Sequence, residues 1–378
     1  MNNKPPKNWN RVSLGEILDY ERPDKYIVSS EDYNDNYKTP VLTAGKTFIL
    51  GYTDENDGIY ENIPVIIFDD FTTESKYVDF NFKVKSSAMK ILKAKNNTTL
   101  KYLYYLMQTI PFNHETHKRY WISEYSKLKI DIPEKIEEQQ EIVQVLDTMS
   151  DIIRLREECI SHAQDLIPAL FQEMFKPYAN YTKTALNNLF EFKSGGTPSK
   201  QVEEYFQGDI PWITTVALNK LFIGKEDANE LITEEAIQKS ATKLIPANSL
   251  LFGTRVGIGK LAINTVPMCT NQDIVAMIPF ENNNLNLVYA YWYLKQINNF
   301  FVANGRGATI QGITTHLVRS TEIILPPLKV QEQFAEKVRE INSYIEEQQE
   351  ELENAKQMFQ SLLHHAFTGE LTKHKYGE

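Results

Sequence analysis

The sequence is poor in cysteine, has no long apolar run and carries no excess of positive charge. Cys159 and Cys269 are the two cysteines among 378 residues, and neither has metal-ligand spacing, so a disulfide scaffold and a zinc module are excluded. No segment approaches the ~20 apolar residues that span a bilayer, and residues 1–10 lack the apolar core of a signal peptide. We therefore expect a soluble chain in the reducing cytoplasm.

Catalytic signatures are also missing. The stretch 253–260 resembles a phosphate-binding loop, but it has one residue too many between the outer glycines, and Leu261 stands where a magnesium-binding hydroxyl belongs. We expect a glycine-rich hairpin there. Asp69 and Asp70, with Glu74 and Lys76, resemble a cramped nuclease metal site, and we assign no metal to them. The two aspartates are expected to cap a turn, and acceptance from cytosine N4 is the alternative.

The sequence does contain an internal repeat, because the same order of predicted elements occurs in both halves of the chain. In each half an amphipathic segment is followed by a proline-led strand, a buried strand, a tyrosine-rich helix, a basic loop and a strand ending at proline. The matched segments are 14–20 and 186–192, 40–43 and 211–214, 66–68 and 250–252, 100–107 and 287–294, 117–121 and 304–307, and the strand ends Pro133 and Pro326. The pattern predicts two globular α+β domains of the same plan.

After each terminal proline the sequence changes to an apolar repeat of seven residues, at a constant offset of 192 positions. A period of 3.5 residues over four heptads is typical of a coiled-coil seam, and ~40 helical residues make a rod of roughly 60 Å. Arg156 and Gln348 interrupt both seams in the same layer, and Pro168 predicts a kink or break in the first helix. The predicted seam residues are Ile142, Leu146, Met149, Ile153, Ile160, Ile167, Leu170, Phe334, Val338, Ile341, Ile345, Leu352, Phe359 and Leu362.

These patterns divide the chain into five segments. Globular domains are predicted at 1–133 and 177–328, helices at 134–176 and 329–370, and a tail at 371–378. The net charge of −10 belongs almost entirely to the helices, because each globular segment is neutral. A neutral domain can still present a basic face to a polyanion if its acidic residues lie elsewhere.

The globular segments place hydrogen-bond donors in matching loops. Arginine can bridge guanine O6 and N7, glutamine can do the same on adenine, and hydroxyls and lysines reach phosphates. The residues predicted to contact DNA are Arg22, Lys25, Thr43, Lys46, Thr72, Thr73, Lys76, Lys118, Arg119 and Tyr120 in the first half, and Lys193, Ser194, Thr197, Thr214, Thr215, Thr254, Arg255, Lys260, Arg306 and Gln311 in the second. If the helices pack antiparallel, each domain would meet one part of a two-part site.

In this order and doubling, the chain resembles the specificity subunits of type I restriction-modification systems over essentially its whole length. The resemblance is carried by 193–198 (KSGGTP), 208–213 (GDIPWI), 325–328 (LPPL) leading to Gln333, and 366–371 (AFTGEL). It implies two target-recognition domains joined by two long antiparallel coiled-coil helices, with no catalytic residue of their own. Each domain would read half of a bipartite asymmetric DNA target, and the helices would set the spacing and dock two modification subunits.

The resemblance also implies what the partners supply. Modification subunits would bind S-adenosylmethionine and methylate adenine, and restriction subunits that use ATP and Mg would join them to cleave DNA. The first half departs from the commoner family pattern at 20–25 and 68–73, so the two domains are expected to read different sequences.

Three alternatives remain at the level of sequence. The first is the specificity subunit of a related system whose methylase and nuclease are fused in one chain. The second is an enzyme whose site is not evident in the residue pattern, although the doubled plan and the missing catalytic spacing argue against it. The third is a structural coiled-coil scaffold. Weak salt dependence of DNA binding would favour this alternative.

Overall fold

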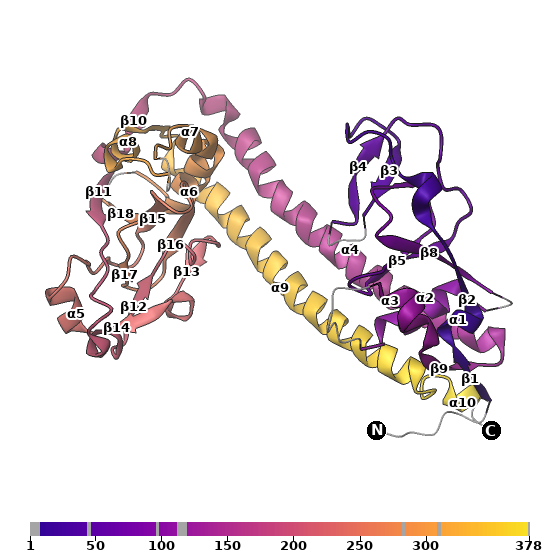
Figure 1. The fold of residues 1–378 in the computed structure, drawn as a ribbon. Coiled ribbons are helices and arrows are strands. Elements are labelled where there is room, and N and C mark those ends of the chain that lie inside the picture. Colours follow the sequence, from indigo (N-terminus) through magenta and orange to yellow (C-terminus); the bar gives the residue numbers. More distant parts are fainter. Residues whose placement is uncertain are drawn as a thin grey trace. The chain divides into compact units, whose positions relative to one another are not determined.

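The computed structural model describes residues 8–43, 47–95, 98–111, 119–281, 284–307 and 311–376. The chain forms two compact units (Figure 1). Unit 1 consists of Met1–Glu157 and Glu350–Glu378, and unit 2 of Glu158–Gln349. Each unit combines a globular α+β part with segments of two long helices, which confirms the predicted fold class. No helix within the described ranges is both long and apolar enough to cross a membrane.

The globular part of unit 1 contains a four-stranded sheet, a three-stranded sheet and a two-stranded ribbon. Their strand orders are β2-β8-β5-β6, β4-β3-β7 and β1-β9. The elements are β1 (Trp9–Ser13), α1 (Leu14–Ile17), β2 (Leu18–Glu21), β3 (Thr39–Leu42), β4 (Ile49–Thr53), β5 (Val65–Asp69), β6 (Ser75–Val78), β7 (Lys83–Val84), β8 (Met89–Ala94), α2 (Leu100–Gln108), α3 (Tyr120–Ser123) and β9 (Lys129–Pro133).

Unit 2 repeats this arrangement with a fifth strand in the larger sheet. Its strand orders are β11-β18-β15-β16-β13, β14-β12-β17 and β10-β19. The elements are β10 (Lys183–Ala185), β11 (Phe190–Ser194), β12 (Ile210–Ile213), β13 (Phe222–Ile223), β14 (Glu230–Ile232), α5 (Glu234–Gln238), β15 (Leu250–Gly253), β16 (Leu261–Asn264), β17 (Cys269–Thr270), β18 (Ile274–Pro279), α6 (Leu287–Gln296), α7 (Asn298–Ala303), α8 (Thr315–Ser320) and β19 (Glu322–Ile324).

The two units share the direction of their pairings as well as the order of their strands. In the three-stranded sheets, β3 pairs antiparallel with β4 and parallel with β7, and β12 pairs antiparallel with β14 and parallel with β17. In the larger sheets, the buried strand β5 pairs with β8, and the buried strand β15 pairs with β18. β8 and β18 are the strands of these sheets that come last along the chain. The internal repeat inferred from sequence is therefore a repeat of topology.

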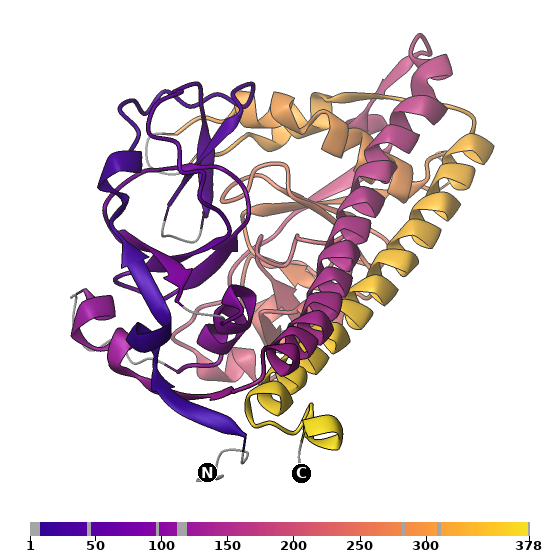
Figure 2. The same cartoon turned by 90° about the vertical axis from the view of Figure 1, so that its right-hand side faces the viewer.

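The long helices are α4 (Ile136–Phe175) and α9 (Leu328–Phe367), each of 40 residues. In unit 1, Ile142 and Leu146 near the start of α4 share a buried cluster with Leu363 near the end of α9. In unit 2 the end of α4 meets the start of α9, because Phe171 shares a cluster with Phe334. The helices are therefore antiparallel where they lie side by side within each unit (Figure 2), as predicted.

All fourteen predicted seam residues are buried or half-buried, but the seam shifts near the helix ends. Phe171 is 7% exposed and Leu363 is 3% exposed, whereas Leu170 and Leu362 beside them are half-buried. A helix turns once in 3.6 residues, so a strict 3.5-residue register drifts. At the ends the helices also pack on the globular parts, where Phe171 stacks on Tyr289 of α6 with ring centroids 5.7 Å apart.

Pro168 does not break the first long helix. The element continues from Ile136 to Phe175 with Pro168 inside it, so a break is a wrong prediction, and the alternative of a kink stays a prediction. Proline leaves the carbonyl four residues earlier without its N–H donor. That residue, Gln164, is exposed, so water can satisfy its carbonyl, and the burial of Ile167 and Phe171 on either side of the proline holds the helix in place.

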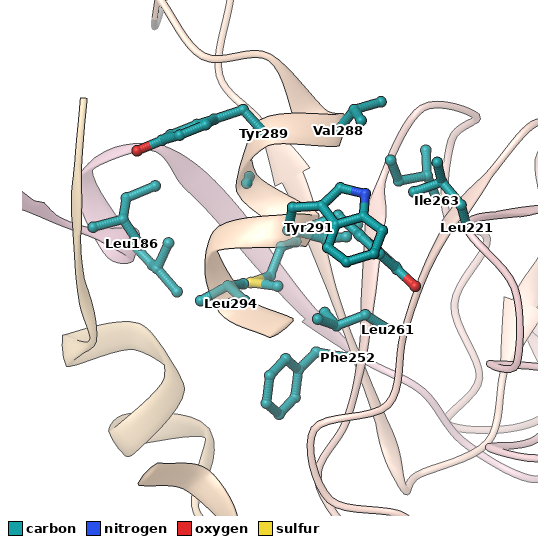
Figure 3. Close-up of a cluster of buried hydrophobic side chains, with 14 of the residues drawn as sticks. Leu186, Leu221, Phe252, Leu261, Ile263, Val288, Tyr289, Tyr291 and Leu294 are labelled. Carbon is teal, nitrogen blue, oxygen red and sulfur yellow. The ribbon is translucent and has the colours of Figure 1, made fainter. Parts of the chain in front are cut away.

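The core of unit 2 is centred on the tyrosine-rich helix α6 (Figure 3). Tyr289 and Leu294 of α6 are almost completely buried, and Phe252 of β15 and Leu186 are both fully buried in the same cluster. The Tyr289 hydroxyl donates a hydrogen bond of 2.6 Å to the carbonyl of Ile324 in β19. One helix thus connects the large sheet, the ribbon and the long helices, and it fixes the positions from which the loops extend.

Candidate nucleic-acid interface

Several strands of unit 2 begin or end at one edge of the domain. Gly253 at the end of β15 pairs with Ile274 at the start of β18, and Ser194 at the end of β11 pairs with Val275. In the smaller sheet the parallel strands β12 and β17 end together, with Ile213 beside Thr270. The loops that leave these strand ends therefore gather at the same edge, which we call the strand-end edge.

Backbone hydrogen bonds tie the loops of this edge to one another. The N–H of Gly196 donates to the carbonyl of Thr270 at 2.8 Å, and the N–H of Asn271 donates to the carbonyl of Ile213 at 3.0 Å. Gly195 has no room for a side chain, because a Cβ would lie 2.1 Å from the carbonyl oxygen of Asn271. The loop at 194–198 is thus packed directly on the turn between β17 and β18.

The predicted glycine-rich hairpin is confirmed as the connection between β15 and the antiparallel β16. Gly257 and Gly259 both have positive φ angles, of 109° and 77°, which favour glycine. The hairpin is joined to the loop after α7 through isolated bridges from Arg255 and from Arg306 to Gly312. Arg255 and Arg306, far apart in sequence, therefore lie on the two backbone segments that pair with the segment of Gly312.

Most predicted contact residues of unit 2 are accessible, and three need comment. Thr215 and Thr254 are 3% and 7% exposed, and the Thr254 hydroxyl donates to the carbonyl of Asp273, so direct contact by these side chains is a wrong prediction. The Thr214 hydroxyl donates to Asn229 at 3.1 Å. The remaining residues are exposed or half-exposed and stay predictions: Lys193, Ser194, Thr197, Arg255, Lys260, Arg306 and Gln311.

In unit 1 the corresponding strand end is organised by two aspartates. Asp69 accepts hydrogen bonds from the N–H groups of Phe71 and Thr72, so it caps the turn after β5 as favoured from sequence. Asp70 is 1% exposed and pairs with Lys90 at 2.8 Å. It also accepts from the N–H of Trp121 at 2.9 Å, which anchors the segment that follows Arg119.

The predicted contact residues of unit 1 have mixed outcomes. Tyr120 is 1% exposed, so direct contact by its side chain is a wrong prediction. The Thr43 hydroxyl donates to the carbonyl of Thr47. Lys46 and Lys118 lie outside the described residues. The others are exposed or half-exposed and stay predictions: Arg22, Lys25, Thr72, Thr73, Lys76 and Arg119.

The turn that carries Arg22 and Lys25 is held by a carboxylate. Glu21 accepts a 2.7 Å hydrogen bond from the hydroxyl of Tyr26 and pairs with Lys93 at 3.0 Å. The hydrogen bond to Glu21 and burial raise the pKa of Tyr26 to about 12. The tyrosine is therefore a neutral donor at physiological pH, and the two basic residues lie between these anchors.

Sequence reasoning missed the turn between β17 and β18. Gln272 is exposed at its tip, and its side-chain oxygen accepts a 2.6 Å hydrogen bond from the hydroxyl of Thr197. No composition or motif signal marks Gln272, because only the fold brings it beside the loop at 194–198. Across the described parts of the chain, no group of three or more His, Cys, Asp or Glu side chains could hold a metal ion.

The chain matches the model of the type I restriction modification DNA specificity domain twice, over residues 6–162 and 178–354. It is 40% identical over 349 residues to the type I restriction enzyme EcoR124I/EcoR124II specificity subunit of Escherichia coli, covering 86% of this chain and 84% of that one. A specificity subunit of a type I restriction enzyme, MjaIX, from Methanocaldococcus jannaschii is 27% identical over 171 residues, which are 44% of this chain and 39% of that one.

Solved structures share the fold at low sequence identity. The S subunit of a type I restriction-modification system from M. genitalium superposes with a TM-score of 0.62 at 16% identity, covering 97% of each chain. A chain from a structural study of complex assembly and conformational transition in a type I R-M system gives 0.60 at 18% identity, covering 97% of this chain and 100% of that one. With two family matches and 40% identity over most of its length, the chain belongs to the type I restriction-modification specificity subunits.

Proposed function

We propose that each unit of this specificity subunit reads one half of a bipartite, asymmetric DNA target. The observation that supports this most directly is the repeated topology, in which donor-rich loops leave corresponding strand ends in the two units. The loops differ between the units, with two buried or capping aspartates after β5 and a glycine-rich hairpin with Arg255 after β15. Different donors imply different half-sites.

The helices α4 and α9 would set the distance between the half-sites. A continuous α-helix of 40 residues extends roughly 60 Å at 1.5 Å per residue, and two packed antiparallel helices resist bending better than one. Half-sites on one face of the duplex recur at intervals of about 34 Å. A helix pair of this length is therefore long enough to act as a ruler over more than one turn.

The same helices would dock two modification subunits. Apolar side chains remain exposed on them, including Ile152 (38%) and Leu155 (50%) on adjacent turns of α4 and Met358 (58%) on α9. Exposed apolar groups on an otherwise acidic helix surface suit a protein interface. The chain itself would be non-catalytic: S-adenosylmethionine would bind the modification subunits, which methylate adenine, and ATP and Mg would serve the restriction subunits. Such a complex would work in the cytoplasm.

Exchange of one domain tests this division of labour. Residues 1–133 would be replaced by those of a relative with a different target, because β9 ends at Pro133 before α4 begins. The chimera, assembled with the modification subunit, should methylate a target in which one half has changed and the spacing has not. A changed spacing between the half-sites would contradict the ruler role of the helices. Changes in both half-sites would contradict the proposal that each domain reads one half-site. Co-purification of a fused methylase-nuclease would identify the related system instead.

A further inference from the structure

The turn between β17 and β18 presents a single side chain outward. Gln272 is exposed, whereas Asn271 before it is buried and Asp273 after it is half-buried. These two neighbours bond to each other, since the amide of Asn271 donates to the Asp273 carboxylate at 3.1 Å and the N–H of Asp273 donates back to Asn271 at 3.2 Å. The turn is closed beneath Gln272 and leaves its side chain at the surface.

This turn is anchored to two strand ends. The N–H of Asn271 donates to the carbonyl of Ile213 at the end of β12 at 3.0 Å. The N–H of Thr254, just after β15, donates to the carbonyl of Asp273 at 2.7 Å. The base of Gln272 is therefore fixed by both sheets of unit 2, and a side chain on such a base is positioned more accurately than one on a free loop.

The orientation of the Gln272 amide is also fixed. The Thr197 hydroxyl donates to its Oε1 at 2.6 Å. Thr197 is held in turn by the packed glycine loop, in which the carbonyl of Gly196 accepts a 3.0 Å hydrogen bond from the indole of Trp212. The Nε2 group of Gln272 has no hydrogen-bond partner among the residues that the structure describes. The side chain thus offers two N–H donors while its oxygen is engaged.

Two donors select for bases with adjacent acceptors. In the major groove guanine presents two acceptors, N7 and O6, whereas adenine presents N7 beside the N6 donor. A glutamine whose oxygen is free pairs with adenine through one donor and one acceptor. Thr197 engages one of the two lone pairs of Oε1 and orients the amide, so the side chain meets a base through Nε2 and fits guanine better than adenine.

We propose that Gln272, oriented by Thr197, is a specificity-determining residue of unit 2 that donates hydrogen bonds to guanine in its half-site. The inference rests on the proposed function, because it assumes that the strand-end edge of unit 2 faces the major groove. It goes further by assigning one residue to one base and by giving Thr197 the role of a positioning residue.

Unit 1 has an equivalent turn with different side chains. The N–H of Lys85 donates to the carbonyl of Leu42 at the end of β3, and the N–H of Asp70 donates to the carbonyl of Ala88. These bonds match the two anchors of the turn in unit 2. The residues between them are Ser86 and Ser87, so the same place in unit 1 carries short hydroxyl side chains. The reading by Gln272 is accordingly confined to the half-site of unit 2.

The test uses the complex of the full chain with its modification subunit. Its target is first defined by methylation mapping, and its affinity is then measured for duplexes carrying each base pair in turn at every position of both half-sites. Gln272→Ala should reduce discrimination at one G·C position of one half-site by about 5- to 150-fold, the range for a bidentate contact. Thr197→Val should keep binding at that position but let adenine compete with guanine, because the amide is then free to turn Oε1 toward the N6 donor of adenine.

Gln207→Ala is the matched control, since Gln207 is exposed just before β12, at the opposite end of that strand from Ile213. It should leave discrimination unchanged at all positions. Unchanged discrimination in Gln272→Ala, or a loss confined to an A·T position, overturns the inference while the proposed function stands. A wild-type complex without any gapped target overturns the proposed function and the inference with it. Intact discrimination at the remaining positions of the same half-site reports that unit 2 is folded in each variant.

Discussion

Gln139 and Gln331, 192 positions apart, share two equivalent hydrogen bonds, and Gln331 also donates to the carbonyl of Asn284 at 3.1 Å. Each lies in the first turn of a long helix, and its side-chain oxygen accepts from the N-cap N–H of the tyrosine-rich helix, at 3.0 Å in unit 1 and 2.9 Å in unit 2. Each side-chain nitrogen donates to a proline carbonyl, Pro133 at 3.0 Å or Pro326 at 2.8 Å. The repeat therefore extends to buried polar contacts, which hold each globular part on its helix.

Removal of this contact should destabilise unit 2. Gln331 is completely buried, and Gln331→Ala leaves the Asn286 N–H and the Pro326 carbonyl without their partner. We expect a loss of roughly 2–6 kcal/mol in the free energy of unfolding, because each of the two unsatisfied groups costs ~1–3 kcal/mol. Denaturant unfolding of the full chain measures it. Gln333→Ala, at an exposed position two residues later, should change the free energy by no more than ~0.5 kcal/mol. Equal effects of the two substitutions would exclude the proposed anchoring.

The stability of unit 1 should depend strongly on both partners of the Asp70–Lys90 ion pair. The two side chains are 1% and 3% exposed, and their charged atoms are 2.8 Å apart. Asp70→Asn should cost about 3–5 kcal/mol by leaving the lysine buried without its counter-charge, and adding Lys90→Met should recover much of that loss. A double-mutant cycle by chemical denaturation checks this. Simple addition of the two losses would mean that the residues do not interact.

Acid should weaken unit 1 through Glu55. Lys83, which is 3% exposed, hydrogen-bonds and pairs with Glu55 at 2.8 Å, and this contact holds the pKa of Glu55 below its ordinary value of 4.5. A depressed pKa in the folded state gives stability that is present above the unfolded pKa and is lost as the pH falls through the folded value. Glu55→Gln should therefore flatten the decline in unfolding free energy below pH 4.5. A variant with the same acid profile as the wild type would refute this source of acid sensitivity.

Arg255 and Arg306 should act on one half-site alone. Both are exposed, and bridges to Gly312 join their backbone segments. Arg255→Ala or Arg306→Ala should weaken recognition of the half-site read by unit 2, by about 1–3 kcal/mol for a base contact, and leave the preference at the other half-site unchanged. Competition binding with duplexes altered in one half-site at a time measures the effect on each half-site separately. Equal loss for both half-sites would remove these arginines from base reading.

Much of this fold follows from sequence because the repeat and the heptads are signals of long range. The expected boundaries 134–176 and 329–370 lie within three residues of α4 and α9, and β9 ends at Pro133 as expected. The site is predictable only in part. The sequence predicts accessible loop positions for Thr254 and Tyr120, but a hydrogen bond of Thr254 and the packing around both residues bury them. Gln272 gains its significance from Thr197, 75 residues away, and only the fold brings them together.

We propose above all that this chain confers a two-part DNA specificity on a methyltransferase. The most direct measurement is co-expression with the modification subunit of its own system, followed by mapping of N6-methyladenine across the host genome by single-molecule sequencing. We expect methylation at one gapped, asymmetric sequence, which disappears when this chain is omitted. An active modification subunit that binds this chain and yet methylates no such sequence would contradict a role in DNA recognition and favour a scaffold role.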